Sequence, residues 1–432
     1  MRKALIPILF GVPGWVRALT PGAIPQVAAD FANNRYWQQG AGTRSFTDLF
    51  ALTRATPETV TSSGGIISYA ASGQPAVSDL GLAVWESRTN LAKQSVDLTN
   101  AAWAIHNGTI STDGTLAPDG SAAQKFTAAA GNTYHEISNT ISIAIVSGST
   151  YQYTVYVKPG TNRYVTVSPG TSAADYAIAV FDVGTGASGS ATQTAVGGTS
   201  GTIVSSASTY IGGGWYRLSL IAHMAGTAGH IQFGLAGAAT GNTISVGDLI
   251  FNAAGTESAY FFLPDLQLGD FASPAIPTTS AAASQGADVV VPAGLLKSIF
   301  ASPSGWLYAN VAGSPSDNTP TIWDKDNANN TPAYFDTTST ITSIMSGVLL
   351  RATLGSGAQS GKVKSLVTWN AAGRSLAANG GTVVSDANTL AGSNTPYLGS
   401  GGGSTFFYDG NFTSIAAGLT RLPDALVKSL ST

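Results

Sequence analysis

The chain has 432 residues, enough for two or three domains, and only 10% of them are charged, against roughly 25% in an ordinary soluble domain. The surface is therefore expected to be solvated mainly by hydroxyls and amides, which suits β-rich proteins of extracellular or virion surfaces, although a biased genomic composition would give the same signal. A net charge of −3 without a basic block argues against nucleic acid as a partner, and the lack of cysteine excludes disulfides, thiolate metal sites and cysteine nucleophiles.

The first 35 residues are predicted to form an extended N-terminal anchor segment. They begin with two cations and a short apolar run, which Pro7 and Pro13 interrupt and which is too short to cross a bilayer, so membrane insertion is not expected. A retained signal peptide and ordinary packing within a domain are the alternatives. The anchor residues expected to dock against a partner are Leu5, Ile6, Ile8, Leu9, Phe10 and Trp15.

Residues 36–273 are predicted to form one β-sandwich with an N-terminal lead-in region. Short segments of alternating apolar and polar residues recur there, and several end at Pro-Gly turns. No long segment in this region has the helical period. The clearest strand segments are "YQYTVYVKPG" (151–160), "RYVTVSPG" (163–170), "YAIAVFDVGTG" (176–186), "GGGWYRLSLIAHM" (212–224) and "HIQFGLAG" (230–237). This pattern is typical of an antiparallel sandwich or jelly roll.

A second β-domain is predicted for residues 293–432, after a linker at 274–292 that is rich in Pro, Ser, Thr and Ala. Its strand segments include "GWLYANVAG" (305–313), "VLLRATLG" (348–355) and "PYLGSGGGSTFFYDGNFTSIAAG" (396–418). A short helix is expected with Pro423 near its start and Thr420 as its cap, and with Leu422, Leu426 and Leu430 on one face. The predicted fold class is all-β, with two antiparallel β-sandwich (jelly-roll) domains after the anchor segment.

Several segments together resemble a family of tailed-phage virion fibre and spike proteins, whose members have a similar E-x-R-T-N-L segment followed by A-x-W and A-P-D-G. The matching segments are "NRYWQQG" (34–40), "SFTDLFALTRAT" (45–56), "GLAVWESRTNLAKQSVDLTNAAW" (81–103), "TLAPDGSAAQKF" (115–126), "GWYRLSL" (214–220) and "YFFLPDLQLGDFASPAIPTTSAA" (260–282). The usual acidic pair before R-T-N-L is here "WES", so only Glu86 remains. The resemblance implies a carbohydrate-binding-module-like sandwich in the middle and a concanavalin- or laminin-G-like jelly roll at the C-terminus.

The segment from Trp85 to Trp103 is interpreted as the first strand and crossover of the middle sandwich. It has neither a clean helical period nor a clean strand period. Arg88 and Glu86 are expected to make fixed contacts with loop carbonyls. The segment is therefore predicted to be structural rather than ligand-binding.

Catalytic and metal-binding patterns are weak in this sequence. His106 and His135 lack metal-ligand spacing, and His223 and His230 are expected to be cross-strand surface neighbours. A G-x-S-x-G nucleophile motif is absent. The acids considered for a glycosidase pair are Asp175, Asp182, Asp248, Glu257, Asp265, Asp324, Asp326 and Asp336. Asp324 and Asp326 are weak Ca²⁺ candidates, for which a polar loop is the favoured interpretation, so neither a metal nor a cofactor is predicted.

Aromatic side chains are the best candidates for a glycan site, because a pyranose face stacks on an aromatic ring. Trp215 and Trp369 lie in strongly patterned strands and are predicted to be core residues. The glycan-binding candidates are Tyr134, Tyr164, Tyr176, Trp323, Tyr397 and Tyr408.

The function predicted from these observations is a non-enzymatic virion protein on the external particle surface. It would attach to capsid, collar or tail proteins through its N-terminus, form a homotrimer and bind host-surface glycan. A polysaccharide-degrading tailspike and a secreted bacterial glycan-binding protein are the alternatives.

Overall fold

The computed structural model divides the chain into two compact units. Unit 1 comprises Met1–Val60, Tyr69–Ser87 and Gly286–Thr432, and unit 2 comprises Thr61–Ser68 and Arg88–Gln285. The structure describes residues 12–172, 175–198, 202–245, 247–271, 273–313, 321–324, 332–335, 341–346, 348–353, 362–390, 396–400 and 409–432, with the backbone alone at 172, 313, 321–353 and 362.

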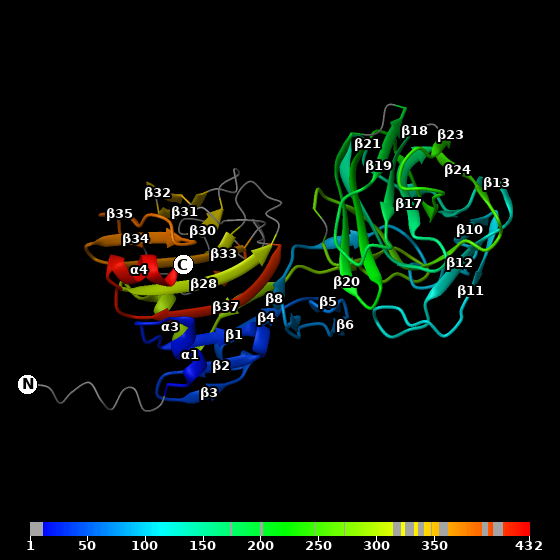
Figure 1. Ribbon diagram of the computed structural model, residues 1–432. Helices are drawn as coiled ribbons and strands as arrows, with labels where there is room; N and C mark the ends of the chain where they lie inside the picture. The colour runs from blue at the N-terminus through cyan, green and yellow to red at the C-terminus, as the bar shows by residue number, and fades with distance from the viewer. Residues whose placement is uncertain are drawn as a thin grey trace, which may run out of the picture. The chain divides into compact units, whose positions relative to one another are not determined.

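Unit 2 is built around two antiparallel sheets (Figure 1). The β17 sheet has the order β10 (Trp103–His106), β14 (Glu136–Asn139), β22 (Ala228–Leu235), β17 (Tyr164–Ser172), β18 (Asp175–Asp182) and β19 (Gln193–Gly197), with β15 (Ile143–Ala144) beside β22. The β16 sheet has the order β11 (Gly108–Ser111), β12 (Gln124–Ala128), β25 (Ser258–Leu268), β16 (Ser149–Pro159), β21 (Trp215–Met224) and β20 (Ile203–Gly212).

The core of unit 2 contains side chains from both sheets, because alternate residues of each strand point to the same face. Val165 and Val167 of β17 and Tyr153 of β16 belong to this core. Phe233 links its aromatic members, with ring centroids 5.5 Å from Trp103 and 5.0 Å from Phe261. The alternation read from the sequence therefore gives the correct inward faces.

Two smaller sheets complete unit 2. One has the order β13 (Gly131–Tyr134), β24 (Asp248–Ala253) and β23 (Thr243–Ser245). Leu249 of β24 packs with Ile178 and Val180 of β18, so this small sheet covers an apolar part of the β17 sheet on the face opposite the core. The other pairs β9 (Arg88–Asn90) with β26 (Ala283–Gln285).

Unit 1 is also a sandwich. Its β28 sheet has the order β3 (Gly42–Arg44), β2 (Arg35–Gln38), β1 (Val27–Asp30), β37 (Gly410–Gly418), β28 (Gly305–Gly313), β33 (Lys362–Asn370), β34 (Gly373–Ala378) and β35 (Val384–Asp386), with β8 (Gly81–Val84) beside β37 and β7 (Val77–Ser78) beside β8. Its β27 sheet has the order β32 (Val348–Thr353), β31 (Ile341–Ser346), β30 (Pro332–Phe335), β29 (Thr321–Asp324), β36 (Tyr397–Leu398), β27 (Val289–Pro292) and β4 (Phe50–Thr53). A separate hairpin pairs β5 (Glu58–Thr61) with β6 (Ile67–Ala70).

Helices are short. They are α1 (Gly14–Leu19), η2 (Phe31–Asn33), α2 (Phe46–Leu49), α3 (Gly294–Ala301) and α4 (Asp424–Leu430). Helix α4 is the expected C-terminal helix, but Pro423 rather than Thr420 is its N-cap residue, and it buries Val427 and Leu430. None of the helices in the described part of the chain combines the length and apolar character needed to span a membrane. The prediction of an all-β chain with two antiparallel sandwiches is confirmed.

The domain boundaries differ from those predicted in three places. Residues 36–60 belong to unit 1, because β4 pairs with β27 and β2 lies in the β28 sheet. The 1–35 segment is not all an extended arm, because β1 is fully buried and Val27 pairs with Ala417. Residues 274–292 are not a free linker, because Thr278 and Asp288 are buried and β26 and β27 are paired strands. The polar groups of these small residues are hydrogen-bonded, so the segment can be buried. Its composition alone does not show this.

The R-T-N segment is structural, as predicted. The Arg88 guanidinium donates to the carbonyl of Leu268 and lies 4.2 Å from the ring centroid of Phe271. The buried Asn90 side chain donates to the carbonyl of Ile276 at 2.7 Å and accepts from the Leu266 amide at 3.1 Å. This motif therefore fixes the start of unit 2 against its end.

Candidate functional site

The β17 sheet is apolar toward the core and carries a polar patch on its other face. On β14, Ile137 enters the core, whereas Glu136 and Ser138 point away from it. On β22, Phe233 enters the core, whereas Gln232 belongs to the opposite face. Successive side chains of a strand point to opposite faces of the sheet. The apolar residues of these strands face the core, so the polar residues between them lie on the other face.

The strand register brings these polar residues together from segments far apart in the sequence. In one row, His106 of β10 pairs with Glu136 of β14, which pairs with Gly234 of β22. In the next row, Ser138 pairs with Gln232, which pairs with Ser168 of β17.

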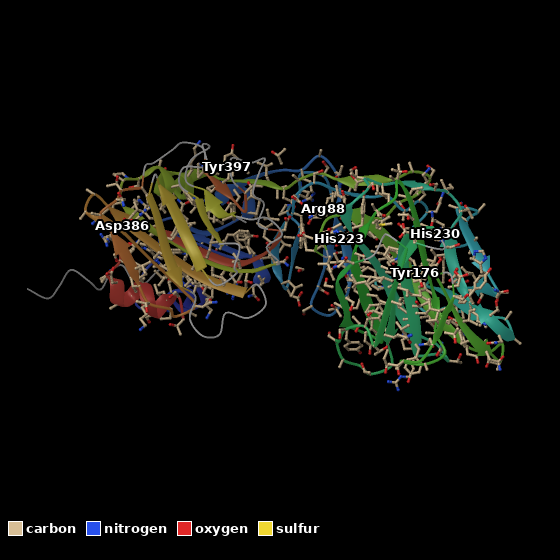
Figure 2. The ribbon with its side chains drawn as sticks, turned by 90° about the horizontal axis from the view of Figure 1, so that it is seen from above. Arg88, Tyr176, His223, His230, Asp386 and Tyr397 are labelled. Atoms are coloured by element: carbon tan, nitrogen blue, oxygen red, sulfur yellow. The ribbon has the colours of Figure 1, made fainter. Side chains whose placement is uncertain are left out.

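A third row pairs His230 of β22 with Gly170 of β17, and Gly170 with Tyr176 of β18. Figure 2 shows the labelled His230 and Tyr176 in the same part of unit 2. These rows and the neighbouring small sheet bring together a set of side chains that we call the polar face. Its members are His106, Glu136, Ser138, Ser168, Tyr176, His230, Gln232 and Asp248.

The small sheet brings a second acid to this face. The Gln232 side chain donates to the carbonyl of Gly247 at 2.7 Å, which fixes the start of β24 over the second row. Asp248 is the next residue and is half-buried. The polar face therefore combines two carboxyl groups, two imidazoles, one amide, two serine hydroxyls and one phenol.

Two glycines allow the close packing of this face. A Cβ on Gly234 would lie 2.2 Å from the His135 carbonyl oxygen, so the backbones of β22 and β14 approach too closely for any side chain there. A Cβ on Gly197 would lie 2.4 Å from the Tyr176 ring, which shows that this ring lies across β19. Tyr176 is half-buried, and its ring is held on the sheet rather than free in solvent.

The electrostatics of the polar face are unusual because it holds acids without basic partners. Glu136 is 4% exposed, and burial together with the nearby Asp248 charge raises the pKa of Glu136 to about 8. Burial also raises the pKa of Asp248, against the effects of Gln232 and the two histidines. Within the described residues, the ion pairs of the structure leave both Glu136 and Asp248 without an arginine or lysine.

The histidines of the polar face are held by hydrogen bonds. His106 Nε2 lies 3.0 Å from Ser138 Oγ, and His230 Nε2 lies 3.1 Å from Gln232 Oε1. Burial lowers the pKa of His230, so its imidazole is neutral near pH 7. In the part of the chain that the structure describes, no group of three or more His, Asp or Glu side chains could hold a metal ion.

The tyrosines predicted from the sequence in unit 2 are distributed unequally around this face. Tyr176 belongs to it, and the Tyr134 ring lies 5.6 Å from the His106 ring at its edge. Tyr164 packs, like Tyr176, against the apolar cluster under the small sheet, and the Arg163 guanidinium lies 5.4 Å from its ring centroid.

Of the candidates in unit 1, the structure describes the side chain of Tyr397 and the backbone of Trp323. Tyr397 is half-buried in β36, and the backbone of Trp323 lies in β29 opposite Leu398. Of the Ca²⁺ candidates, Asp324 has its backbone at the end of β29, and Asp326, like Tyr408, lies outside the described residues. Trp369 and Trp215 are core residues of units 1 and 2, as predicted.

Two expectations about single residues need correction. His223 and His230 are not neighbours, because β21 and β22 belong to different sheets; His223 Nδ1 lies 2.9 Å from Thr150 Oγ1 instead. Trp15 is not a free anchor residue, because it lies in α1, packs on the apolar cluster of Val16 and Trp37, and has the Arg35 guanidinium 5.1 Å away. The other anchor residues, Leu5 to Phe10, lie outside the described residues.

Glu136 is the main residue that sequence reasoning missed. It was absent from the acids considered because the segment from His135 to Asn139 has only one strongly apolar residue. The available signal was the alternation of Glu136, Ile137 and Ser138, which predicts a strand with a carboxylate and a hydroxyl on one face.

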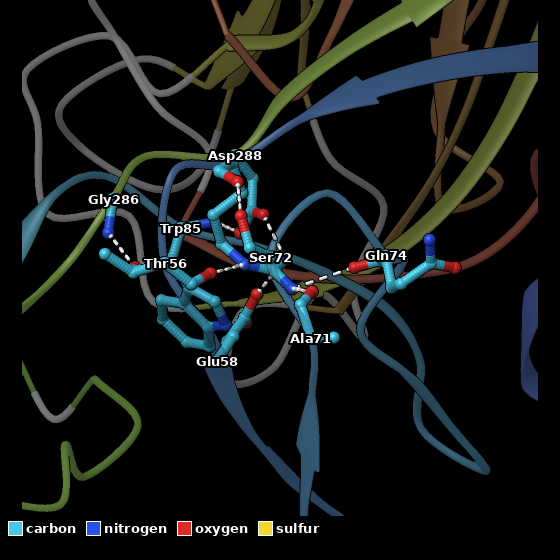
Figure 3. A network of polar contacts seen from close by, with 9 residues as sticks. Thr56, Glu58, Ala71, Ser72, Gln74, Trp85, Gly286 and Asp288 are labelled. Carbon is cyan, nitrogen blue, oxygen red and sulfur yellow. Dashed lines mark hydrogen bonds and ion pairs between the residues drawn. The ribbon is translucent and has the colours of Figure 1, made fainter.

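A second pair of buried acids lies in unit 1 (Figure 3). Arg54 Nη1 donates to Glu58 at 2.6 Å and to Asp288 at 2.7 Å, and all three side chains are fully buried. The rest of the Arg54 guanidinium donates to the carbonyls of Thr56, Ala71 and Gln74. Burial and the charge of Asp288 raise the pKa of Glu58 well above its usual range, and burial also raises the pKa of Asp288.

A hollow of about 270 Å³ opens elsewhere in unit 2, near the ends of β14 and β15. The described residues that line it are mostly apolar, and Lys93 is its charged member. They include neither an aromatic ring nor a carboxylate, so this hollow is a weaker glycan site than the polar face.

Comparisons with known proteins identify no family. No family model matches the chain, and no curated protein matches it. Among solved structures, the chain is similar to the mouse laminin α1 chain, domains LG4-5, at 8% identity over 79% of this chain and 91% of that chain, with a TM-score of 0.20. A likeness of this size identifies no ligand or partner.

Proposed function

We propose that this protein is a fibre or spike protein of a tailed-phage virion, and that unit 2 binds host-surface glycan through its polar face. In this proposal it is not an enzyme and uses no cofactor. Its N-terminal segment attaches to capsid, collar or tail proteins, three copies form a homotrimer, and the sandwiches are displayed on the outside of the particle.

The observation that carries the glycan proposal is the arrangement of the polar face. Sugar recognition needs several hydrogen-bonding groups directed to one place and an apolar ring against which a pyranose can stack. The register gathers Glu136, Ser138 and Gln232 into such a set, and Tyr176 lies in the adjoining row on the same sheet. Glu136, Ser138 and Gln232 lie on the face opposite the core between the two sheets, and each is 5% exposed or less.

The virion part of the proposal is supported by the combined sequence resemblance. The segment from Trp85 to Trp103 supplies its most characteristic part, and Arg88 and Asn90 within it tie the two ends of unit 2 together. A low charge content without cysteine also suits a protein displayed outside a cell.

Two measurements test the proposal. Binding of the labelled full chain to an array of bacterial surface glycans is expected to select a few related structures, and an array without any signal would contradict glycan binding. Immunogold electron microscopy of particles from the source genome, with antibody to residues 290–432, is expected to label the tail, collar or head. Particles without label would remove the virion assignment and leave the secreted glycan-binding protein.

A glycan-degrading tailspike is the second candidate, because Glu136 and Asp248 are two acids on one face and both have raised pKa values. A glycosidase uses one protonated and one ionised carboxyl group on either side of the scissile bond. Release of reducing ends from the array ligands, lost in Glu136→Gln, would support this candidate over simple binding.

A further inference from the structure

We propose that residues 273–278 form a strap that closes over the outer face of the β16 sheet in acid and opens toward neutral pH, with Asp265 as the side chain that controls it. The outer face is the one opposite the core between the two sheets of unit 2. The inference concerns only unit 2 and does not depend on glycan binding.

The strap is held by side chains rather than by strand pairing. In the described part of the chain, no backbone hydrogen bond joins residues 273–278 to another main chain, and Pro274 and Pro277 have no amide hydrogen to donate. Ser273, Ile276 and Thr278 are nevertheless buried. Because a few side-chain hydrogen bonds hold such a segment, it can leave while the strands under it stay paired.

The two ends of the strap are bound to different parts of unit 2. The Ser273 amide donates to Gln152 Oε1 at 2.9 Å, and the Ser273 hydroxyl donates to Gln267 Oε1 at 2.6 Å. At the other end, the Thr278 amide donates to Ser95 Oγ at 2.8 Å. Gln152 and Gln267 are directly opposite one another in β16 and β25, so they form one row that receives the start of the strap.

The middle of the strap is bound to Asp265. The Ile276 amide donates to Asp265 Oδ2 at 2.6 Å. The Gln267 side chain donates to the same oxygen at 2.9 Å and to the Pro274 carbonyl at 3.1 Å. Asp265 therefore contacts the strap directly at Ile276 and indirectly, through Gln267, at Pro274.

The closed strap covers polar atoms that it does not satisfy. Asp265 Oδ1, Thr154 Oγ1 and Arg217 Nε are buried without a hydrogen-bond partner among the described residues. Thr154 is directly opposite Asp265 in the register, and the Arg217 guanidinium donates to the Ser273 carbonyl, so these atoms belong to the surface that binds the strap. A buried polar group without a partner costs free energy, and opening to water would recover that cost. The contacts of the strap are thus opposed by the groups beneath it.

The charge of Asp265 makes this balance depend on pH. Burial raises the pKa of Asp265 to about 7, against the hydrogen bonds from Ile276 and Gln267 and the charge of Arg217. With the strap open, water reaches the carboxyl group and its pKa returns toward the ordinary value of 3.8. The closed state therefore holds a proton that the open state releases. Closure is fully favoured below about pH 4 and weakens as the pH rises to about 7.

The groups that face Asp265 keep their charge in this range. The strap and residues 61–68 contain no ionisable side chain. Strand β9 meets the strap with Asn90, whereas its Arg88 donates to the Leu268 carbonyl. His223 lies two same-face steps along β21 from the row of Asp265 and bonds to Thr150. The groups whose charges act on Asp265 are Arg217 and two tyrosines with raised pKa values, Tyr153 and Tyr156.

Hydrogen exchange of the full chain at pH 5, 6, 7 and 8, corrected for the intrinsic exchange rate at each pH, tests the inference. Protection in peptides that contain residues 273–278 is expected to fall about tenfold per pH unit between pH 5 and pH 7 and then to level off, as for the release of one proton. Peptides from β16 are expected to keep their protection, because the strands stay paired when the strap opens.

Three variants separate the strap from its surroundings. Asp265→Asn keeps an oxygen for the Ile276 amide but has no charge at any pH, so protection of the strap should stay within about twofold from pH 5 to pH 8. Ser273→Ala removes the hydroxyl bond to Gln267 and should lower protection at every pH while the pH dependence remains. Glu136→Gln is the matched control, because Glu136 is another buried acid of unit 2 with a raised pKa but lies in the other sheet. It should leave the pH dependence of the strap unchanged.

Several outcomes would overturn the inference. Protection of residues 273–278 that is constant from pH 5 to pH 8, or that varies as much in Asp265→Asn as in the wild type, would remove Asp265 from control. If peptides from β16 lose protection together with the strap, the event is unfolding of unit 2 rather than opening. A pH dependence that disappears in Glu136→Gln would place control in the other sheet. Should Asp265→Asn fail to fold, unchanged protection in Ser273→Ala would show that these contacts do not hold the segment.

Discussion

In unit 1, Arg54 lies between Glu58 and Asp288, whereas in unit 2 Glu136 and Asp248 share a face on which the described chain places neither arginine nor lysine beside them. Both pairs have raised pKa values, and burial is the largest cause in each. The difference lies in what balances the charge. The unit 1 pair carries its own cation and every donor of Arg54 meets an oxygen, so it is closed to ligands.

The contrast shows why a raised pKa alone does not mark a binding site. Burial shifts carboxyl groups in structural networks and in functional sites alike. What distinguishes Glu136 is the balance of charge, because Arg54 pairs with Glu58 whereas none of the ion pairs among the described residues includes Glu136. On this argument the first pair stabilises unit 1, and the second costs stability in unit 2.

The largest expected effect comes from removing the cation of unit 1. Arg54→Met leaves two buried acids without compensation and three backbone carbonyls without a donor, which should cost at least about 5 kcal/mol in free energy of unfolding. Hydrogen exchange of peptides from β4 and β27 is expected to show loss of protection there. Unchanged protection would contradict a closed structural network.

A matched control for this substitution is Arg35→Met. Arg35 also pairs with an aspartate, Asp30, but its side chain is 44% exposed. An exposed pair contributes about 1 kcal/mol or less, so protection of β1 and β2 should change little. Similar losses in both variants would mean that any arginine of unit 1 has this effect.

The next effect concerns the pH dependence of unit 2. Because the pKa of Glu136 is raised from 4.5 to about 8, the folded state holds a proton that the unfolded chain releases near pH 4.5. The contribution of Glu136 to stability is therefore fully present below pH 4.5 and is lost as the pH rises to about 8. The loss amounts to a few kcal/mol, with about 5 kcal/mol as the upper bound.

Urea unfolding at pH 5 and pH 9, followed by hydrogen exchange in β14 and β22, measures this loss. Glu136→Gln is expected to flatten the pH dependence but not abolish it, because burial also raises the pKa of Asp265 in unit 2 to about 7. Parallel curves for the wild type and the variant would show that Glu136 does not titrate in this range.

The sequence predicts the strands better than their partners. The alternation in residues 163–170 correctly places Val165 and Val167 in a core, because burial on one face of a sheet imposes a period of two. It does not show that β1 lies beside β37, at the other end of the chain, since local sequence does not specify which distant strand completes a sheet. The boundary between the two units was misplaced for this reason.

The candidate site also has parts that the sequence predicts and parts that depend on strand pairing. Tyr176 could be predicted because an aromatic residue in a patterned strand is visible locally. The polar face could not, because its rows join His106, Glu136 and His230 from three separate strands, and only the register brings them together. The burial of Glu136 became evident only in the structure.

A smaller effect tests which unit binds glycan. Tyr176→Leu should lower the affinity of the full chain for its array ligand about tenfold, through the lost stacking surface. Tyr397→Leu is the matched control, because Tyr397 is also a half-buried strand tyrosine predicted from the sequence as a glycan contact, but it lies in unit 1. A larger effect for Tyr397 would move the glycan site to unit 1.

The smallest effect defines the limit of the polar face within the β17 sheet. Arg163 lies beside Tyr164 and pairs with Asp182. Tyr164 is one same-face step along β17 from the row that holds Glu136 and three steps from the row that holds His230. Arg163→Met removes the cation next to Tyr164, a predicted glycan tyrosine, while keeping an apolar side chain over its ring. If the site is confined to the polar face, glycan affinity should stay within about twofold of the wild type. A tenfold loss would extend the site to Tyr164.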